Sequence, residues 1–402
     1  MVVGGGQAGL AMSYLLQERG RQHIVLERNR VAERWQSERW NSLAFQFPNW
    51  AIRLPGFEYK GEEPDAFAHY TEIAKLLEDY ARLIEAPIES NTEVKSLSKD
   101  PDTDTFIVNT TKGVLTSSNV VVATGPFQKP LLPGFASRCP SNVFQVHASQ
   151  YRGPTELPKG AVLVVGSGAS GCQIAEELYQ NGRTVCLCVS RHRRAPRRYR
   201  GKDLTWWLLG MGRMDTRIDS FPDRKIPPSI VITGVDGGHD INIRHFGNDG
   251  VIVLGGLLGI DGNRLSFRDN AEEILAFSDN AFRDFGRAAD QYAMKIGSGL
   301  SEEGLEIPQF EPVRSTPSLD LRDASITSII WSTGHMFDFD WIQVPVFNDR
   351  GAPIQERGVT ACPGLYFLGL HWMHTFKSGV LFGVGEDASY IAERIPGGIE
   401  EH

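Results

Sequence analysis

Cysteine is scarce in this chain. Five residues in 402 are cysteine, at positions 139, 172, 186, 188 and 362, and no two form a Cys-x-x-Cys pair. So small and scattered a set excludes a disulfide framework. Because Cys and His residues at zinc-binding spacing are also missing, we expect no metal site. The redox-active dithiol that a disulfide reductase of the classical type needs is absent as well.

The chain also lacks long apolar runs and an excess of positive charge. No run reaches the ~20 apolar residues that cross a bilayer, so we expect no membrane partner. The formal net charge of −8 argues against nucleic acid as a partner. The chain opens MVVGGGQAG, without a basic region or an apolar signal segment, and we therefore expect a cytoplasmic protein.

Glycine, by contrast, is abundant, with 42 residues, several of them in patterned clusters. The first cluster follows the apolar strand Met1–Val3 and matches the GxGxxG pattern of dinucleotide-binding turns. The first glycine permits the tight turn, the second lets a pyrophosphate reach the backbone, and the third lets helix and strand pack closely. The predicted cofactor contacts in this turn are Gly4, Gly6, Gln7, Ala8 and Gly9. Because the strand is short, either the native chain starts earlier or this strand is truncated.

The residues after the first turn complete a nucleotide-binding unit. A helix through Leu10–Leu15 and a strand at His23–Leu26 are expected, and Glu27 follows about 20 positions after the first glycine. An acid at this place accepts hydrogen bonds from a ribose, so Glu27 and Arg28 are predicted contacts of the ADP half of FAD. The alternative is a surface turn with an incidental glutamate.

A second GxGxxG turn follows the apolar strand Ala161–Val165. Its predicted cofactor contacts are Gly166, Ser167, Gly168, Ser170 and Gly171. The next strand ends in Ser190 and Arg191, with Arg194 nearby, and not in an acid. A carboxylate would repel a 2′-phosphate, whereas serine and arginine bind it, so this site is predicted to prefer NADPH. The other arginines of the run are expected at the surface or at an interface.

Two short strands each end in a Thr-Gly turn, and a third strand precedes the last helix. The turns are Ala123, Thr124 and Gly125, and Ser332, Thr333 and Gly334; the third strand ends near Gly369. Together with two GxGxxG turns they are typical of flavoproteins that bind two dinucleotides. The N-terminus of the last helix would then face the flavin and stabilise negative charge there.

These motifs in this order resemble the class B flavoprotein monooxygenases, and most of all bacterial flavoproteins akin to the auxin-forming type. The resemblance covers about residues 1–200 and 325–395. It rests on GGGQAG at 4–9, GSGASG at 166–171, the loop from Arg34 to Leu43, ATG at 123–125, RRYRGKD at 197–203 and STG at 332–334. The family fingerprint FxGxxxHxxxY is matched in half: His147 and Tyr151 keep their places, whereas Ser141 and Val143 replace Phe and Gly.

The resemblance implies an enzyme that reduces FAD with NADPH and adds O2 to give a flavin C4a-(hydro)peroxide, which oxygenates a small organic substrate at nitrogen, sulfur or a carbonyl carbon. Gln46 holds the place of a family asparagine and is the candidate catalytic residue; alternatively it is a polar loop residue. Trp35, Trp40 and Val94 are further predicted FAD contacts, although aromatic residues this dense are equally typical of a core.

The expected architecture is α/β, with two doubly wound Rossmann-like dinucleotide-binding domains. The FAD-binding domain comprises 1–152 and 325–402, and the NADPH-binding domain, 153–324, is inserted in it. The apolar stretch Trp206–Met211 would cover the nicotinamide or form a homodimer interface. Two other functions stay open: an FAD-dependent NAD(P)H oxidoreductase without oxygen insertion, including the disulfide-reducing type, and a flavin- or nucleotide-binding regulatory protein.

Overall fold

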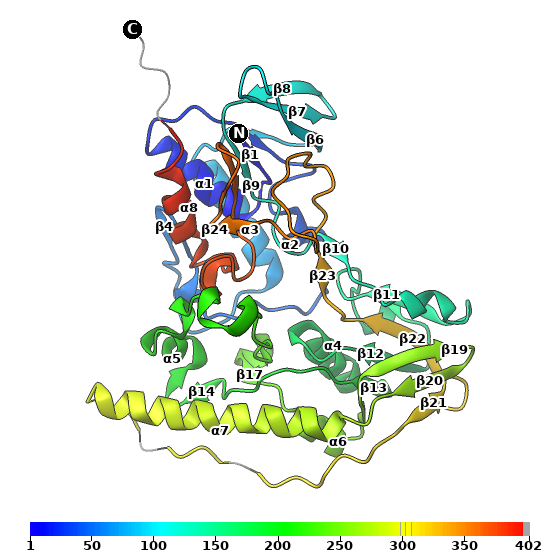
Figure 1. Ribbon diagram of the computed structural model, residues 1–402. Coiled ribbons are helices and arrows are strands. Elements are labelled where there is room, and N and C mark those ends of the chain that lie inside the picture. Colours follow the sequence, from blue (N-terminus) through cyan, green and yellow to red (C-terminus); the bar gives the residue numbers. More distant parts are fainter. Residues whose placement is uncertain (298, 302, 307, 397–402) are drawn as a thin grey trace.

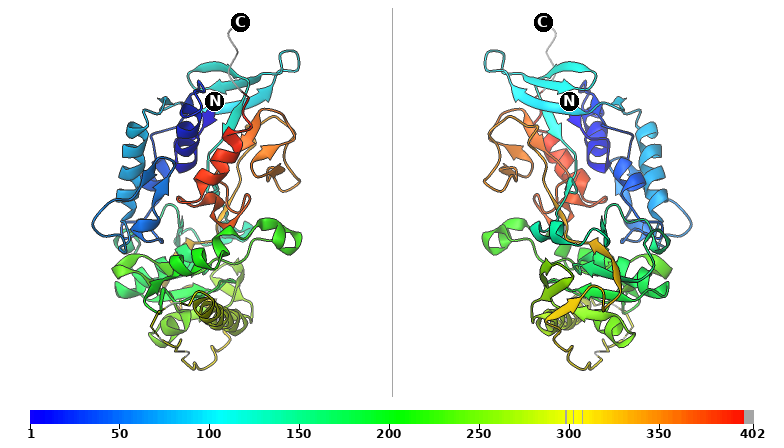
Figure 2. Two further views of the ribbon diagram at one scale, coloured as in Figure 1. Left: turned by 90° about the vertical axis from the view of Figure 1, so that its left-hand side faces the viewer. Right: turned by 90° about the vertical axis from the view of Figure 1, so that its right-hand side faces the viewer.

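The computed structural model describes residues 1–297, 299–301, 303–306 and 308–396. The chain forms two α/β halves, one above the other in Figure 1, and the N-terminus lies at the far end of the upper half. Figure 2 shows the same two halves from both sides. Within the described residues, no helix combines the length and the apolar character that crossing a bilayer requires.

The upper half is built on a seven-stranded sheet that holds the N-terminal glycine turn. The spatial order is β24-β25-β26-β9-β1-β2-β5, in which β26 to β5 are parallel and β24 and β25 are antiparallel. The strands are β1 (Val2–Val3), β2 (Val25–Leu26), β5 (Ile88–Glu89), β9 (Val120–Val122), β24 (Gln355–Glu356), β25 (Val359–Thr360) and β26 (Leu365–Phe367). The central strands are apolar at every position because both of their faces are covered.

Helices and small antiparallel sheets complete the upper half. Helix α1 (Gln7–Gln17) joins β1 to β2 and packs against α8 (Val384–Ala392), as Figure 1 shows. The remaining elements are α2 (Glu33–Ser37), α3 (Tyr70–Leu83), the pair β3 (Arg53–Leu54) and β4 (Phe57–Glu58), and the sheet of β6 (Val94–Lys99), β7 (Phe106–Thr110) and β8 (Gly113–Ser117).

The lower half is built on a five-stranded sheet, entirely parallel, in the order β11-β22-β12-β13-β18. The strands are β11 (Phe144–His147), β12 (Ala161–Val165), β13 (Val185–Cys188), β18 (Ile252–Leu254) and β22 (Ile326–Trp331). Helix α4 (Ala169–Gln180) joins β12 to β13, which repeats the β–α–β arrangement of the upper half. Cys186 and Cys188 lie buried on one face of β13, as their alternation with apolar residues predicts.

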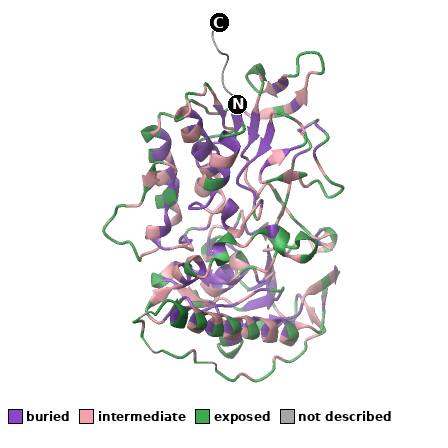
Figure 3. Cartoon of the chain, turned by 60° about the vertical axis from the view of Figure 1, so that its left-hand side comes forward, coloured by how far each residue is buried: buried purple, intermediate pink, exposed green. Residues whose placement is uncertain are grey.

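The outer part of the lower half contains the long helix α7 (Ala271–Lys295). It runs along the molecule's edge, with one face buried and the other exposed (Figure 3). The apolar stretch 206–211 falls largely in α5 (Leu204–Gly210), where Trp207 is fully buried against Tyr199 and Tyr292. Other elements are α6 (Ile243–Asn248), β14 (Arg198–Tyr199) with β15 (Lys202–Asp203), β16 (Ile232–Thr233) with β17 (His239–Asp240), and the sheet of β19 (Leu257–Asp261), β20 (Arg264–Phe267) and β21 (Ser318–Asp320).

The two sheets correct the predicted domain boundaries at 152/153 and 324/325. Strands β11 and β22 fall in the stretches assigned to the FAD-binding domain, but they pair with each other and with β12 in the lower sheet. The reason is burial: Ile329, Ile330 and Trp331 fill the lower core in register with Leu163–Val165. Residues 397–402, the end of the predicted first domain, lie outside the described residues.

The two connections between the seven-stranded and the five-stranded sheet pair with each other. Strand β10 (Lys129–Pro130) leaves the upper half and pairs antiparallel with β23 (His335–Met336), which returns from β22. The Leu131 amide donates to the Gly334 carbonyl at 3.0 Å. The pairing holds the ends of β9 and β22 near each other.

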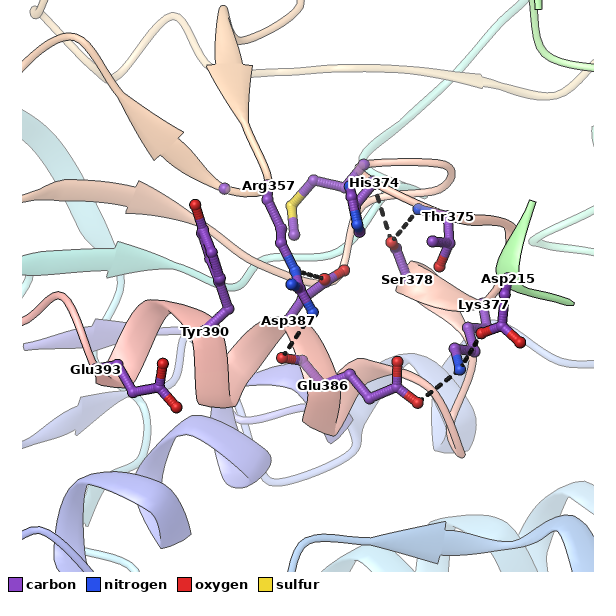
Figure 4. A network of polar contacts seen from close by, with 12 residues as sticks. Asp215, Arg357, His374, Thr375, Lys377, Ser378, Glu386, Asp387, Tyr390 and Glu393 are labelled. Carbon is purple, nitrogen blue, oxygen red and sulfur yellow. Dashed lines mark hydrogen bonds and ion pairs between the residues drawn. The ribbon is translucent and has the colours of Figure 1, made fainter. Parts of the chain in front are cut away.

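A polar network joins the C-terminal segment to the lower half (Figure 4). The nearly buried Lys377 ammonium lies 2.5 Å from the Asp215 carboxylate and 2.6 Å from that of Glu386. The Ser378 hydroxyl accepts the amide hydrogens of His374 (3.1 Å) and Thr375 (3.0 Å). The network therefore fixes the loop at 371–379, which reaches the first glycine turn through Gly379.

The third glycine of each turn should be required for folding. A Cβ at Gly9 would lie 1.9 Å from the Gly4 carbonyl oxygen, and a Cβ at Gly171 would lie 1.9 Å from that of Gly166. Gly9→Ala and Gly171→Ala are each expected to destabilise the fold by about 3 kcal/mol, because the helix must move off its strand. Gly6→Ala and Gly168→Ala are the matched controls, since a Cβ there meets no atom within 4 Å, and all four variants are compared as protein freed of bound nucleotide. Equal melting temperatures for all four variants would contradict the prediction.

Candidate functional site

The first glycine turn presents the start of α1 directly above the end of β1. Gly4 has φ +114°, a backbone conformation that a side chain rarely adopts, and Gly9 lets the helix approach the Gly4 carbonyl. Gly6 is the N-cap of α1 and supplies no side chain to bond the first amides of the helix. These free amides, beside an open glycine Cα, form the arrangement that binds a pyrophosphate.

Glu27 lies at the end of β2, beside this turn. Its carboxylate accepts the Gly5 amide hydrogen at 2.6 Å and the Asn29 amide hydrogen at 2.9 Å, which holds the side chain in place. Arg28 is exposed next to it. The structure therefore brings Glu27 together with the turn, in the position from which an acid reaches a ribose.

The second glycine turn has the same geometry. Gly166 has φ +105°, and Gly168 is the N-cap of α4, with no atom within 4 Å of its Cβ position. The Ser167 amide donates to the Ser190 hydroxyl at 3.1 Å, and the Ser167 hydroxyl donates to the Ser190 carbonyl at 2.9 Å. Ser190 therefore lies at the end of β13 beside the turn, where the adenosine ribose of a dinucleotide is held.

The structure separates the two arginines predicted to bind a 2′-phosphate. Arg191 is exposed next to Ser190, with its guanidinium 4.2 Å from the centre of the Phe277 ring. Arg194 is 5 % exposed, stacks on Phe282 at 4.0 Å and lies near the carboxylates of Asp240 and Asp279, 3.9 and 3.8 Å away. Only Arg191 stands free beside the second turn, because Arg194 is drawn inward by these acids.

The Thr-Gly turns bring the carboxyl ends of the two sheets together. Ala123, Thr124 and Gly125 follow β9, and Gln128 donates to the Thr124 hydroxyl (3.0 Å) and the Gly125 carbonyl (2.8 Å). Ser332, Thr333 and Gly334 follow β22, and Thr333 donates to the Leu131 carbonyl. Gly369 follows β26 beside Ala8 of the first turn. Ligands of parallel α/β sheets bind at these carboxyl ends.

Four aromatic side chains meet at this place, and we name them the junction cluster: Phe127, His147, His335 and His371. The Phe127 ring lies 5.2 Å from His335 and 4.9 Å from His371, and the rings of His147 and His335 are 4.8 Å apart. Gln7 of the first turn donates to the Gly379 carbonyl at 2.9 Å, and Gly379 is adjacent to His371. The cluster therefore connects the first glycine turn with the end of β22.

The histidines of the junction cluster are neutral at pH 7. The protein atoms around His371 lower its pKa to about 4 by desolvation, although the residue is exposed to solvent on one side. Burial, together with His147, Arg34, Arg39 and His371, lowers the pKa of His335 to about 4. The His147 ring nitrogens bond the Ser149 hydroxyl and the Gly334 carbonyl, which ties β11 to the turn after β22.

The remaining predicted site residues do not gather at one place. Trp35 packs edge-on against Phe45, at 6.0 Å, on the side of the junction. Trp40 is buried in the core of the lower half, and Val94 begins β6 at the edge of the upper core. Gln46 is half-buried; its backbone carbonyl accepts a hydrogen bond from Arg197 at 2.7 Å, and its side-chain amide has no hydrogen bond within the described residues.

Sequence reasoning missed Phe127, His335 and His371. Each follows a predicted strand-end turn within a few positions: Gly125 precedes Phe127, Gly334 precedes His335, and Gly369 precedes His371. Because parallel strands end at a common edge, the residues just after such turns are candidates for the site. That signal was present in the sequence.

Comparison with known proteins agrees with this geometry. The family model described as pyridine nucleotide-disulphide oxidoreductase matches residues 1–210. An uncharacterized CzcO-like oxidoreductase of Geobacillus kaustophilus is 36 % identical over 98 % of this chain and 97 % of its own length. A probable indole-3-pyruvate monooxygenase of Arabidopsis thaliana, YUCCA1, is 30 % identical over 47 % of this chain and 46 % of its own.

Among solved structures, the flavin-containing monooxygenase of Stenotrophomonas maltophilia matches with a TM-score of 0.66 and 17 % identity, over 98 % of this chain and 96 % of that chain. The expected resemblance to flavin monooxygenases is thereby confirmed, and the fold is the α/β fold of those structures. The chain belongs to the pyridine nucleotide-disulphide oxidoreductase family, a family of oxidoreductases that bind FAD and NAD(P).

Proposed function

We propose that this oxidoreductase is an NADPH- and O2-dependent FAD monooxygenase acting on a small organic substrate. One observation carries the proposal. Each of the two glycine turns has free space in front of its helix start, and each lies at the carboxyl edge of its sheet's parallel strands. These two carboxyl edges face each other at the junction cluster. FAD fits the first turn, with Glu27 for its ribose, and NADPH fits the second, with Ser190 and Arg191. Two redox cofactors held in this way can exchange a hydride at the junction.

The chain's own residues supply binding, orientation and a dry environment. When bound, FAD accepts a hydride from NADPH and activates O2, which no side chain does. The amides at the starts of α1 and α4 would hold the two pyrophosphates. Phe127 and the neutral His147 and His335, none of which is exposed, would exclude water, and the two histidines carry no charge themselves.

Gln46 is retained as the candidate catalytic residue. Its half-buried side-chain amide has no hydrogen bond within the described residues, and is therefore available to a ligand. Arg197, 3 % exposed and 2.8 Å from Asp203, holds the Gln46 backbone from the lower half. An amide held in this way can donate a hydrogen bond to an oxygen of the flavin or the substrate.

The family's disulphide chemistry is the second candidate, as a reductase without oxygen insertion. It requires thiols near the flavin, and the cysteines do not meet that requirement. Cys172, Cys186 and Cys188 are buried in the lower half, and burial raises the pKa of Cys186 to about 11. Cys139 and Cys362 are partly exposed; Cys139 packs against the core of the lower half and Cys362 against that of the upper half.

Rapid mixing of reduced enzyme with O2 tests oxygenation. The protein is reduced anaerobically with NADPH and then mixed with O2, and the flavin spectrum is followed. A monooxygenase passes through a long-lived species that is neither oxidised nor reduced flavin while NADP⁺ is bound. Direct return to oxidised flavin with release of H2O2 would contradict the proposal and favour the reductase.

The two turns should be separable by matched alanine variants. Gly6→Ala is expected to lower FAD occupancy of the purified protein several-fold, because the Cβ occupies the approach of the pyrophosphate. Gly168→Ala, which has the same free space around its Cβ, should keep FAD and raise the KM for NADPH. Loss of flavin in Gly168→Ala, with retention in Gly6→Ala, would reverse the assignment of the cofactors.

Arg191→Gln tests the coenzyme preference. Loss of one charge-assisted contact to the 2′-phosphate, worth about 1.5–3 kcal/mol, should raise the KM for NADPH roughly 10- to 150-fold and leave the KM for NADH unchanged. The measurement is steady-state oxidation of both coenzymes. Arg350→Gln, an exposed arginine of the upper half, is the control. Equal effects on both coenzymes would place the phosphate elsewhere.

A further inference from the structure

Within the described residues, the guanidinium groups of Arg34, Arg39 and Arg152 lie near the junction cluster, and the carboxylate that pairs with one of them is that of Glu38. Arg34 pairs with Glu38 at 2.7 Å and donates to the Phe127 carbonyl. Arg152 donates to the carbonyls of Ser149 (3.0 Å) and Tyr151 (2.9 Å), and to that of Ser37. With Glu38 taken by Arg34, the group carries an excess of positive charge.

In the part of the chain that the structure describes, neither Arg152 nor Arg39 pairs with a carboxylate, but Arg152 is bound by three backbone carbonyls, whereas Arg39 keeps most of its donors unused. Within the described residues its only polar contact is with the backbone carbonyl of Glu38, at 2.9 Å. Its guanidinium lies 4.9 Å from the centre of the Trp35 ring and 5.9 Å from that of Phe127. A guanidinium held over aromatic rings keeps most of its five donors for another partner.

The surroundings of Arg39 make an anionic partner favourable. Arg39 is half-buried. Burial, and to a smaller extent Arg34 and Arg152, lower its pKa to about 10 against the opposing effect of the Glu38 carboxylate, so Arg39 stays charged at pH 7. The positive charges of Arg34 and Arg39 also contribute to the low pKa of His335. A cation that is partly desolvated and repelled by two others gains more from a carboxylate than a surface arginine does.

We propose that Arg39 binds the carboxylate of an organic-acid substrate whose apolar part lies against Trp35 and Phe127. This proposal rests on the proposed function, because it places the substrate beside the end of the flavin-binding turn. The rings offer apolar contact, and the neutral histidines offer no competing charge. Arg39 therefore decides that the bound substrate is negatively charged. Amines, which carry a positive charge at pH 7, are disfavoured at this place.

The role of Arg39 can be tested by comparing the affinity of the protein for an organic acid with its affinity for the uncharged amide of that acid. Phenylacetate and phenylacetamide, and likewise hexanoate and hexanamide, have nearly the same shape and differ in charge. Each is titrated into the FAD-containing protein while the flavin absorbance and the tryptophan fluorescence are followed. The wild-type protein should bind each acid at least about tenfold more tightly than its amide. Arg39→Gln should lose this ratio, and Arg39→Lys should keep part of it.

Arg350→Gln, which removes one exposed charge, should keep the wild-type ratio and controls for net charge. Equal binding of acids and amides by the wild-type protein, or an unchanged ratio in Arg39→Gln, would overturn the proposal. If the wild-type protein shows no such ratio and Arg39→Gln releases FAD, the guanidinium serves a cofactor phosphate instead. Because tryptophan fluorescence reports on the apoprotein too, a preference for acids in protein that binds no flavin would refute the proposed function and leave Arg39 in its role.

Discussion

The close approach of a helix to the strand before it is the constraint on which both halves depend. At Gly9 and Gly171 the helix backbone passes so near the turn that even a methyl group would overlap a carbonyl oxygen. That approach places the first amides of α1 and α4 directly at the carboxyl ends of β1 and β12. A helix start in this position concentrates partial positive charge where a parallel sheet leaves room for a ligand.

The carboxyl edges of the parallel strands in the two sheets lie next to each other. Because β10 pairs with β23, the ends of β9 and β22 are held together, and the loop after β26 is held by the network around Lys377. Residues far apart in sequence, such as Phe127, His335 and His371, thereby become neighbours. The chemistry of the family needs this meeting, since a hydride passes between cofactors only at contact.

Whether an arginine is available to a ligand depends on its tertiary surroundings and not on its position in the chain. The arginines that follow β13 look alike in the sequence, but their surroundings differ. Arg191 faces solvent, and Arg194 turns toward Asp240 and Asp279. Arg197 pairs with Asp203 and donates a hydrogen bond to the Gln46 carbonyl. The acids that draw Arg194 and Arg197 inward come from later segments of the chain. At the junction the balance is different: within the described residues Arg34 pairs with Glu38, Arg152 bonds backbone carbonyls, and Arg39 has neither a carboxylate nor more than one carbonyl.

The sequence by itself determined the two glycine turns, their strands and helices, the acid at Glu27, and Ser190 with Arg191 at the equivalent place. These depend on local geometry: a tight turn, a helix start and a strand end lie within about 25 residues of one another. Only the tertiary structure decided that β11 and β22 belong to the lower sheet, that Trp40 fills its core, and that Arg194 is buried. These features depend on pairing and packing between distant segments. The local sequence around a strand or an arginine does not show which distant segment it will contact. The junction cluster stands between these two kinds of feature: its members follow strand-end turns that the sequence marks, but their contacts form only when both sheets have formed.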